Sequence, residues 1–327
     1  MKRPAPTVTR GSRGSGAWIV ALLLGLAAVL IATGLAPRWQ EAFESDGPPS
    51  VLEDAEPDAV LEMEAEVSPE PTVKTETGPE PASPEKLEAL LVAYNEALGR
   101  NDTAGALRHA GAYVAAAPDD AYGYALRGYA HWLRSRCDSA EADMTRAIAL
   151  ADGYGYAFFA RASCRFYMGE IGPAERDARD AVAHAANDGE AGYANELAGW
   201  IAYGQGKFDE AARAFEAAGQ GGDGMAPVGL WLARSRSDPG RDLPLVVPEG
   251  AEKEERLVYD VLAGRRDRAL LQNAARRGGP AAFYLAQLAL LEGRPEEALD
   301  LLGRYTSGGF STDMTFAVAR MQKSQLR

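Results

Sequence analysis

The sequence has few of the side chains that usually carry catalysis or bind metal ions. Only three histidines and two cysteines occur among its 327 residues. His109, His131 and His184 have no carboxylate or cysteine at a ligand spacing, so they predict no metal site. The GxSxG, HExxH and Walker patterns are also missing. These absences predict a protein that is not an enzyme and that uses no cofactor.

Positive charge is also scarce, and the negative charge is concentrated in one segment. The chain has a net charge of −13, whereas nucleic-acid binding needs a basic stripe, so we expect no nucleic-acid partner. Residues 1–40 contain five basic residues and no acidic one, and residues 41–85 contain fourteen acidic residues and one lysine. The remaining 242 residues, with 28 basic and 33 acidic side chains, are expected to be only mildly acidic.

Residues 17–36, AWIVALLLGLAAVLIATGLA, form a run of twenty residues without a charge. A helix of that length is about 30 Å long, which matches the apolar core of a bilayer. Trp18 and Trp39 lie at its two ends, where tryptophan favours the membrane interface. The basic residues before the run place residues 1–16 in the cytoplasm. The sequence therefore predicts a retained single-pass anchor, with a cleaved signal peptide as the alternative; either way, the rest of the chain is exported.

Residues 37–85 are predicted to be an acidic linker. Residues 41–85 contain eight prolines and almost no aromatic residues. Such a segment buries too little apolar surface to offset its chain entropy, so we expect it to be disordered. Its predicted role is to hold a folded domain away from the membrane, with an interaction motif among its acidic residues as the alternative.

From Leu87 onward, alanines and other apolar residues recur at helical spacing. Ala106, Ala140 and Ala174 lie thirty-four residues apart, and each opens the predicted second helix of a two-helix unit. Apolar residues follow each of them at the same two positions, four and seven residues further on. The stretch GKFDEAARAFEAA repeats this pattern from Gly206.

This pattern resembles the tetratricopeptide repeat, a helix–turn–helix unit of thirty-four residues with small side chains where its two helices cross. The resemblance implies an all-α solenoid of stacked hairpins with a concave surface. It covers residues 86–220 well, and residues 254–310 contain further hairpins of this kind. Residues 221–253 break the period and are expected to be an irregular linker with room for one helix. Residues 311–327 are expected to be a C-terminal helix or tail.

The resemblance also implies which side chains line the concave surface and bind a protein or peptide partner. Nine aromatic residues and one glutamate of the first helices are expected there: Tyr122, Tyr129, Trp132, Tyr156, Phe159, Phe166, Tyr193, Glu196, Trp200 and Tyr203. Large amphipathic rings are typical of protein-recognition sites. The alternative is that some of these rings pack in the core between neighbouring helices.

Some members of the family bind a C-terminal carboxylate through Lys, Arg and Asn side chains of the first helices. Of the corresponding positions in this chain, only Asn95 fits, because the others are Leu91, Leu126, Tyr156 and Ala160. We therefore expect a partner that is bound through apolar and aromatic contacts.

Cys137 and Cys164 are the only cysteines. Cys137 is expected in the turn between two helices, and Cys164 toward the end of the next first helix; these places come close in stacked repeats. Because disulfides persist in an exported domain, one prediction is a bridge between the two residues. The alternative is that both are small buried side chains.

Together these features predict a protein of the bacterial inner membrane, with a cytoplasmic N-terminus, a bilayer contact through residues 17–36 and a periplasmic C-terminal domain. Its predicted function is that of a scaffold or adaptor for protein–protein interaction in a cell-envelope complex. One alternative is a holdase-like periplasmic chaperone for translocating or envelope proteins. The other is a structural component of a secretion or polymer-export machine. The partner, the pathway and the oligomeric state do not follow from the sequence.

Overall fold

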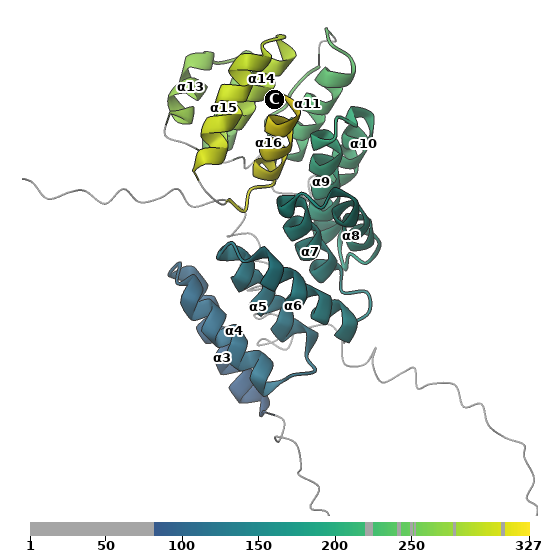
Figure 1. Cartoon of the computed structure of the whole chain (residues 1–327), viewed down its shortest axis with the longest axis vertical. Helices are drawn as coiled ribbons and strands as arrows, with labels where there is room; N and C mark the ends of the chain where they lie inside the picture. Colours follow the sequence, from purple (N-terminus) through teal and green to yellow (C-terminus); the bar gives the residue numbers. More distant parts are fainter. Residues whose placement is uncertain are drawn as a thin grey trace, which may run out of the picture.

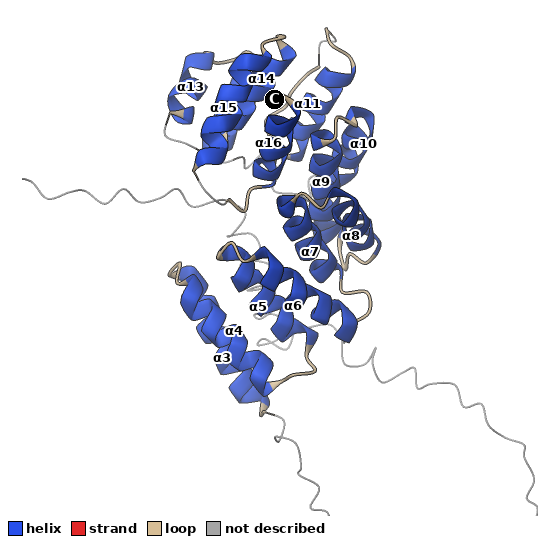
Figure 2. Cartoon of the chain, in the orientation of Figure 1, coloured by secondary structure: helices blue, strands red, loops and turns tan. Residues whose placement is uncertain are grey.

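The computed structural model describes residues 82–219, 225–240, 243–248, 251, 253–276, 279–308 and 311–327. All regular secondary structure in these residues is helical (Figure 2), which confirms the all-α prediction for this part of the chain. Its fourteen helices are α3 (Pro84–Gly99), α4 (Thr103–Ala116), α5 (Ala121–Leu133), α6 (Cys137–Leu150), α7 (Gly155–Met168), α8 (Ile171–Ala183), α9 (Asp188–Gly204), α10 (Phe208–Ala218), α11 (Ala226–Ser237), α12 (Lys253–Leu262), α13 (Arg268–Ala275), α14 (Ala281–Leu291), α15 (Pro295–Ser307) and α16 (Met314–Gln325).

The two predicted N-terminal segments lie largely outside the described residues. None of the described helices is long and apolar enough to cross a bilayer, and the predicted anchor, residues 17–36, is not among them. At its end, the predicted linker overlaps the first helix, because α3 begins at Pro84. Ser83 caps this helix by accepting a hydrogen bond from the backbone N–H of Lys86, and proline is favoured in the first turn.

The first eight helices form four hairpins, α3–α4, α5–α6, α7–α8 and α9–α10. The two helices of each hairpin pack together, and each second helix packs on the first helix of the next hairpin. Figure 1 shows the hairpins stacked in sequence order from the α3–α4 end of the molecule. Since no hairpin can bury its apolar face alone, the stack provides the continuous core that each of them needs.

Small residues allow the two helices of a hairpin to approach closely. The alanines that open the repeated pattern have no exposed surface: Ala106, Ala140, Ala174 and Ala211. A Cβ atom added at Gly128 would lie 2.8 Å from Cε of Met144. One added at Gly199 would lie 2.7 Å from the ring of Phe215. The thirty-four-residue pattern therefore marks the positions at which the two helices of each hairpin contact each other.

The four hairpin turns share one backbone conformation. The residue with positive φ is Asn101 (58°), Ser135 (61°), Gly169 (89°) and Gly206 (76°) in successive turns. Because this conformation costs an ordinary L-residue about 1–2 kcal/mol, glycine and asparagine are favoured there. The repeat thus extends from the helices into the turns.

Buried ion pairs recur with the same period in the second and third hairpins. Arg127 of α5 binds Asp143 of α6 through two hydrogen bonds of 2.9 and 2.6 Å. Thirty-four residues later, Arg161 of α7 binds Asp177 of α8 through bonds of 2.8 and 2.9 Å. Both carboxylates are almost fully buried. Each pair ties the two helices of its hairpin together.

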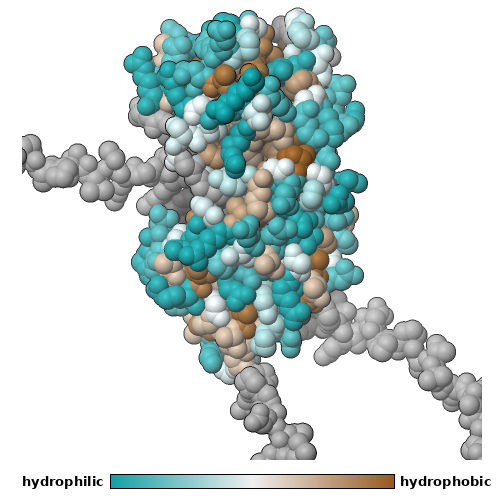
Figure 3. Space-filling model, viewed as in Figure 1, coloured by the Kyte–Doolittle hydropathy of each residue, from teal (hydrophilic) through white to brown (hydrophobic). Residues whose placement is uncertain are grey.

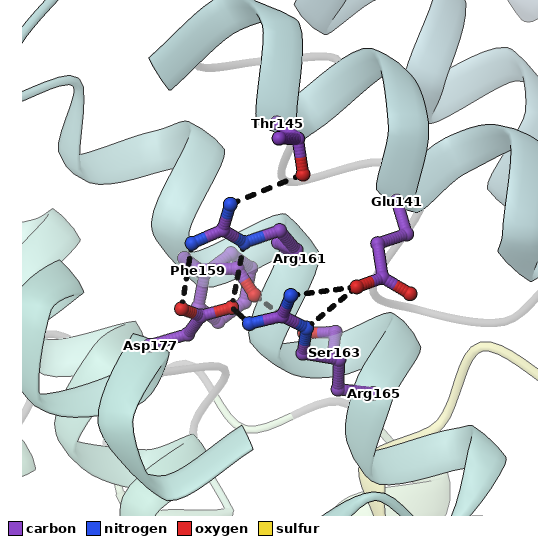
Figure 4. Close-up of polar contacts among 7 residues, drawn as sticks. All are labelled: Glu141, Thr145, Phe159, Arg161, Ser163, Arg165 and Asp177. Carbon is purple, nitrogen blue, oxygen red and sulfur yellow. Dashed lines mark hydrogen bonds and ion pairs between the residues drawn. The ribbon is translucent and has the colours of Figure 1, made fainter. Parts of the chain in front are cut away.

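The third hairpin extends its pair into a network that reaches the previous hairpin (Figure 4). Arg165 donates to Asp177 over 2.8 Å and to Glu141 of α6 over 2.8 Å. Arg161 also donates to the hydroxyl of Thr145 of α6 over 3.1 Å. Asp177 therefore accepts hydrogen bonds from two guanidinium groups, and these groups connect α8 to α6.

The C-terminal helices do not simply continue the stack. Helix α16 returns to pack on α9 and α7 (Figure 1). Phe316 of α16 stacks on Tyr167 of α7, with 5.8 Å between the ring centroids. The side chain of Gln325 donates to the backbone oxygen of Gly204 at the end of α9, over 3.1 Å. One end of the predicted concave surface is thus covered by the chain itself.

Candidate functional site

The structure divides the ten residues predicted to bind a partner into two groups. Half of them are buried in the folded chain: Tyr129, Phe166, Glu196, Trp200 and Tyr203. The other half are partly exposed: Tyr122, Trp132, Tyr156, Phe159 and Tyr193. The difference follows from what packs against each first helix.

Trp200 of α9 packs in the main core, with 1 % of its surface exposed. Its ring lies 4.9 Å from that of Phe215 of α10 and 5.8 Å from that of Phe283 of α14. Its indole N–H donates over 3.4 Å to the carboxylate of Glu196, which has no exposed surface. These two residues of α9 therefore contact the chain itself and are not available to a partner in this structure.

Tyr203 belongs to a buried polar cluster that joins three helices. Its hydroxyl donates to the side-chain oxygen of Gln287 of α14 over 2.9 Å. The amide of Gln287 donates in turn to Gln322 of α16 over 2.9 Å. A buried polar group without a partner costs about 1–3 kcal/mol. The three side chains therefore favour the arrangement of α14 and α16 against α9 in which all of them are hydrogen-bonded.

Tyr129 and Phe166 are buried nearer the N-terminal hairpins. Tyr129 of α5 packs with Met144 of α6 and Ala157 of α7 in the core between the second and third hairpins. Phe166, at 3 % exposure, belongs to the main core that α9 and the C-terminal helices also form. Both residues therefore pack in the core between neighbouring helices, which is the alternative to a place on the binding surface.

The partly exposed tyrosines occupy one register position in three successive first helices. Tyr122 is the second residue of α5 and Tyr156 the second residue of α7, thirty-four residues apart. Tyr193 holds the matching place in α9, although it is the sixth residue of that helix; it lies six residues before Gly199, just as Tyr122 lies six before Gly128. We call Tyr122, Tyr156 and Tyr193 the tyrosine ladder.

Phe159 extends the ladder between α7 and α9. Its ring lies edge-on to that of Tyr193, with 6.4 Å between centroids. Trp132, the remaining partly exposed residue, lies edge-on to Tyr167, with 5.7 Å between centroids. On the face drawn in Figure 3, apolar residues form small groups among hydrophilic ones.

Two ladder tyrosines take part in a larger tyrosine cluster at the first three hairpins. Besides burial, four neighbouring tyrosines raise the pKa of Tyr156: Tyr94, Tyr122, Tyr129 and Tyr154. Tyr94 donates its hydroxyl hydrogen to the backbone oxygen of Leu126 over 3.1 Å. Burial raises the pKa of Tyr122 and that of Tyr129 to about 12. It raises the pKa of Tyr156 well above its usual value. These hydroxyls consequently stay neutral at physiological pH.

The chemistry of this surface suits hydrogen bonding and ring stacking. Neutral phenol groups can both donate and accept hydrogen bonds, and their rings present a large area at low entropic cost. Among the described residues, no group of three or more His, Cys, Asp or Glu side chains could hold a metal ion.

The three histidines lie on separate elements. Nε2 of His131 is 3.8 Å from Asp143, and burial lowers the pKa of this histidine. His184 stacks on Phe158, with 5.6 Å between the ring centroids. His109 lies on α4. His131 therefore lies beside a buried ion pair, and His184 packs against an aromatic ring.

The two cysteines meet at the boundary between the second and third hairpins. Cys137 is the first residue of α6 and Cys164 lies in α7. They pack together with Ala140, and both are free thiols in this structure. The stacked repeats thus bring the two positions together, as the sequence indicated, while both side chains are also small and buried.

The recurring Arg–Asp pairs were not identified from the sequence. The signal was available, because both partners recur after thirty-four residues and each arginine precedes its aspartate by sixteen. The first hairpin has Ala93 and His109 at these two positions, and the fourth has Ala198 and Ala214. The pairs are therefore confined to the two hairpins on which the cysteines and two of the ladder tyrosines lie.

No protein-family model and no curated protein sequence matches the chain. A tetratricopeptide repeat protein from Parabacteroides merdae is similar in structure, at 17 % identity over 73 % of this chain and 99 % of that chain, with a TM-score of 0.43. The MamA protein is 16 % identical over 69 % and 97 % of the two chains, with a TM-score of 0.40. The first tetratricopeptide domain of Spaghetti (RPAP3), bound to the HSP90 peptide SRMEEVD, is 20 % identical over 38 % and 96 %, with a TM-score of 0.35. All three scores are below 0.5, whereas the contacts within this chain show the stacked hairpins directly.

Proposed function

We propose that this protein is a non-enzymatic scaffold that binds a segment of another polypeptide on the tyrosine ladder and Phe159. The observation that supports this function is the recurrence of a partly exposed tyrosine at one register position of α5, α7 and α9. A position that served core packing alone would not need a tyrosine that remains partly exposed. Regularly placed, neutral phenols are suited to a partner that passes along several hairpins.

The proposed partner segment is apolar or aromatic, with backbone groups free to hydrogen bond. Tyrosine rings supply contact area with few rotatable bonds, and the phenol groups can pair with peptide N–H and C=O groups. None of the ladder residues or Phe159 carries a charge that would bind a terminal carboxylate. The segment can therefore lie within a longer chain.

The proposed place of action is the periplasmic side of an inner membrane. Residues 17–36 would anchor the chain, and the acidic linker that follows would set the reach of the hairpins. This part of the proposal is supported by the amino-acid sequence and by the distribution of its charges. The scaffold would then hold its partner near the membrane.

Photo-crosslinking in intact cells tests this function. The photoreactive residue p-benzoylphenylalanine would replace Tyr193 in the full-length chain, and the adducts would be identified by mass spectrometry. We expect one predominant protein adduct, because a scaffold binds a specific partner. The control places the same residue at Val92 of α3, which is 51 % exposed and lies outside the ladder.

The two positions give distinguishable outcomes. An adduct at position 193 that is missing at position 92 supports the scaffold. Many unrelated adducts at position 193 would favour a holdase-like chaperone instead. The same products at both positions would contradict a binding surface on the ladder.

A further inference from the structure

The cysteine pair lies where the N-terminus of α6 meets α7. The side chains of the two cysteines pack in one small cluster with Ala140, and each thiol influences the pKa of the other. Cys164 is 1 % exposed, whereas Cys137 is 7 % exposed. The pair is therefore asymmetric, with one sulfur nearer to solvent than the other.

Cys137 forms part of the wall of an open surface pocket of about 520 Å³. Arg136, Tyr167 and Arg320 also line this pocket, so a molecule from solvent that enters it meets the Cys137 side of the pair. Cys164 is not among the lining residues.

The surroundings favour the thiolate form of Cys137. As the first residue of α6, it lies at the positive end of the helix dipole, and no side chain caps this end. The hydrogen bond with Cys164 lowers the pKa of Cys137, and the charge of Arg320 contributes in the same direction. The same hydrogen bond, together with burial, raises the pKa of Cys164. Cys137, the less buried member of the pair, is therefore the more reactive nucleophile.

We propose that Cys137 and Cys164 form a thiol–disulfide exchange site, in which Cys137 attacks an external disulfide and Cys164 resolves the product. The external reactant is a disulfide of a small thiol or of another protein; oxidised glutathione serves as the probe. The product is a bond that joins α6 to α7 and thereby links the second hairpin to the third.

The exchange is balanced in two steps. The Cys137 thiolate attacks one sulfur of oxidised glutathione, the glutathione disulfide breaks, and one glutathione leaves and takes up the proton that Cys137 has lost. Cys164 then gives up its proton and attacks the Cys137 sulfur. The mixed disulfide breaks, and the second glutathione leaves as a thiol. The two cysteines lose two electrons and two protons in total, and one oxidised glutathione becomes two reduced molecules.

The bond would stabilise the junction between the two hairpins. It would close a loop from residue 137 to residue 164 and so restrict the unfolded chain. The thiols already pack against each other in the reduced fold, so little rearrangement opposes the bond. We expect the oxidised protein to melt several degrees above the reduced protein.

Mass spectrometry of the reduced full-length chain after incubation with oxidised glutathione tests this site. The parent protein is expected to lose about 2 Da, for two hydrogens, and to retain no glutathione. The Cys164→Ser variant is expected to accumulate one glutathione on Cys137, because no second thiol resolves it. The Cys137→Ser variant is expected to react at least tenfold more slowly, because Cys164 is buried and its thiolate is disfavoured.

Three results would overturn the proposal. One is a parent protein that keeps both thiols free under conditions that modify Cys164→Ser. Another is a stable glutathione adduct on the parent protein. The third is equal reaction rates for the two single variants; circular dichroism of each variant shows whether a fast reaction merely reflects an unfolded chain.

Discussion

The Asp177→Asn variant is expected to have a free energy of unfolding about 3 kcal/mol lower than that of the parent protein. Asp177 is 3 % exposed and accepts hydrogen bonds from Arg161 and Arg165. Removing its charge leaves two largely buried guanidinium groups without their shared counter-ion. Urea denaturation of the full-length chain, followed by circular dichroism, measures the loss.

An exposed ion pair on α15 provides the matched control. Asp300 and Arg304 are one turn apart, and their side chains are 57 % and 64 % exposed. Since solvent screens such a pair, Asp300→Asn should cost less than about 1 kcal/mol. Equal losses in the two variants would show that the network around Asp177 does not hold α8 to α6 and α7 as described.

The Trp200→Ala variant is expected to lose about 4 kcal/mol of stability, because it opens a cavity in the core. Trp200 is 1 % exposed and packs between Phe215 and Phe283. Tyr193→Ala removes an aromatic residue that is partly exposed on the same helix. Its expected cost is no more than about 1 kcal/mol. Urea denaturation compares the two losses directly.

The same two variants separate folding from binding. With the photoreactive residue placed at position 156, Tyr193→Ala should weaken the crosslink while the protein stays folded. Trp200→Ala should weaken the crosslink only at urea concentrations or temperatures at which the variant unfolds. A folded Trp200→Ala protein that has lost its crosslink would place Trp200 in the binding surface after all.

The helical hairpins could be predicted from the sequence because their contacts are local and repeat. Ala106, Ala140 and Ala174 recur every thirty-four residues where two consecutive helices cross, and all three are fully buried in the structure. A hairpin contact joins residues about one helix apart, so its periodicity is visible in the chain. The all-α architecture follows from that periodicity.

Which parts of the chain pack on the exposed face of each first helix could not be predicted in the same way. The register indicates which face of α9 Trp200 and Tyr203 occupy, but not what packs on that face. Tyr203 bonds to Gln287, eighty-four residues further along the chain. Gln322, which bonds to Gln287, lies on a helix outside the repeated hairpins. A contact of this range leaves no period in the sequence.

The ladder and the ion pairs lie between these two cases. Tyr122 and Tyr156 are spaced by the repeat, so their shared position could be predicted, whereas their partial exposure depends on how closely neighbouring side chains pack against each ring. The Arg127–Asp143 and Arg161–Asp177 pairs combine a sixteen-residue and a thirty-four-residue spacing. Their recurrence could have been read from the sequence once the hairpins were aligned.

Hydroxyl-radical footprinting tests the central claim most directly, because it reports the solvent exposure of each aromatic ring without a substitution. The full-length chain would be oxidised alone and in complex with the protein captured by crosslinking. We expect Tyr122, Tyr156 and Tyr193 to be oxidised in the free chain and protected in the complex. Trp200 and Tyr203 should remain unoxidised in both states. Oxidation of Trp200 and Tyr203 in the free chain, with protection by the partner, would contradict the account.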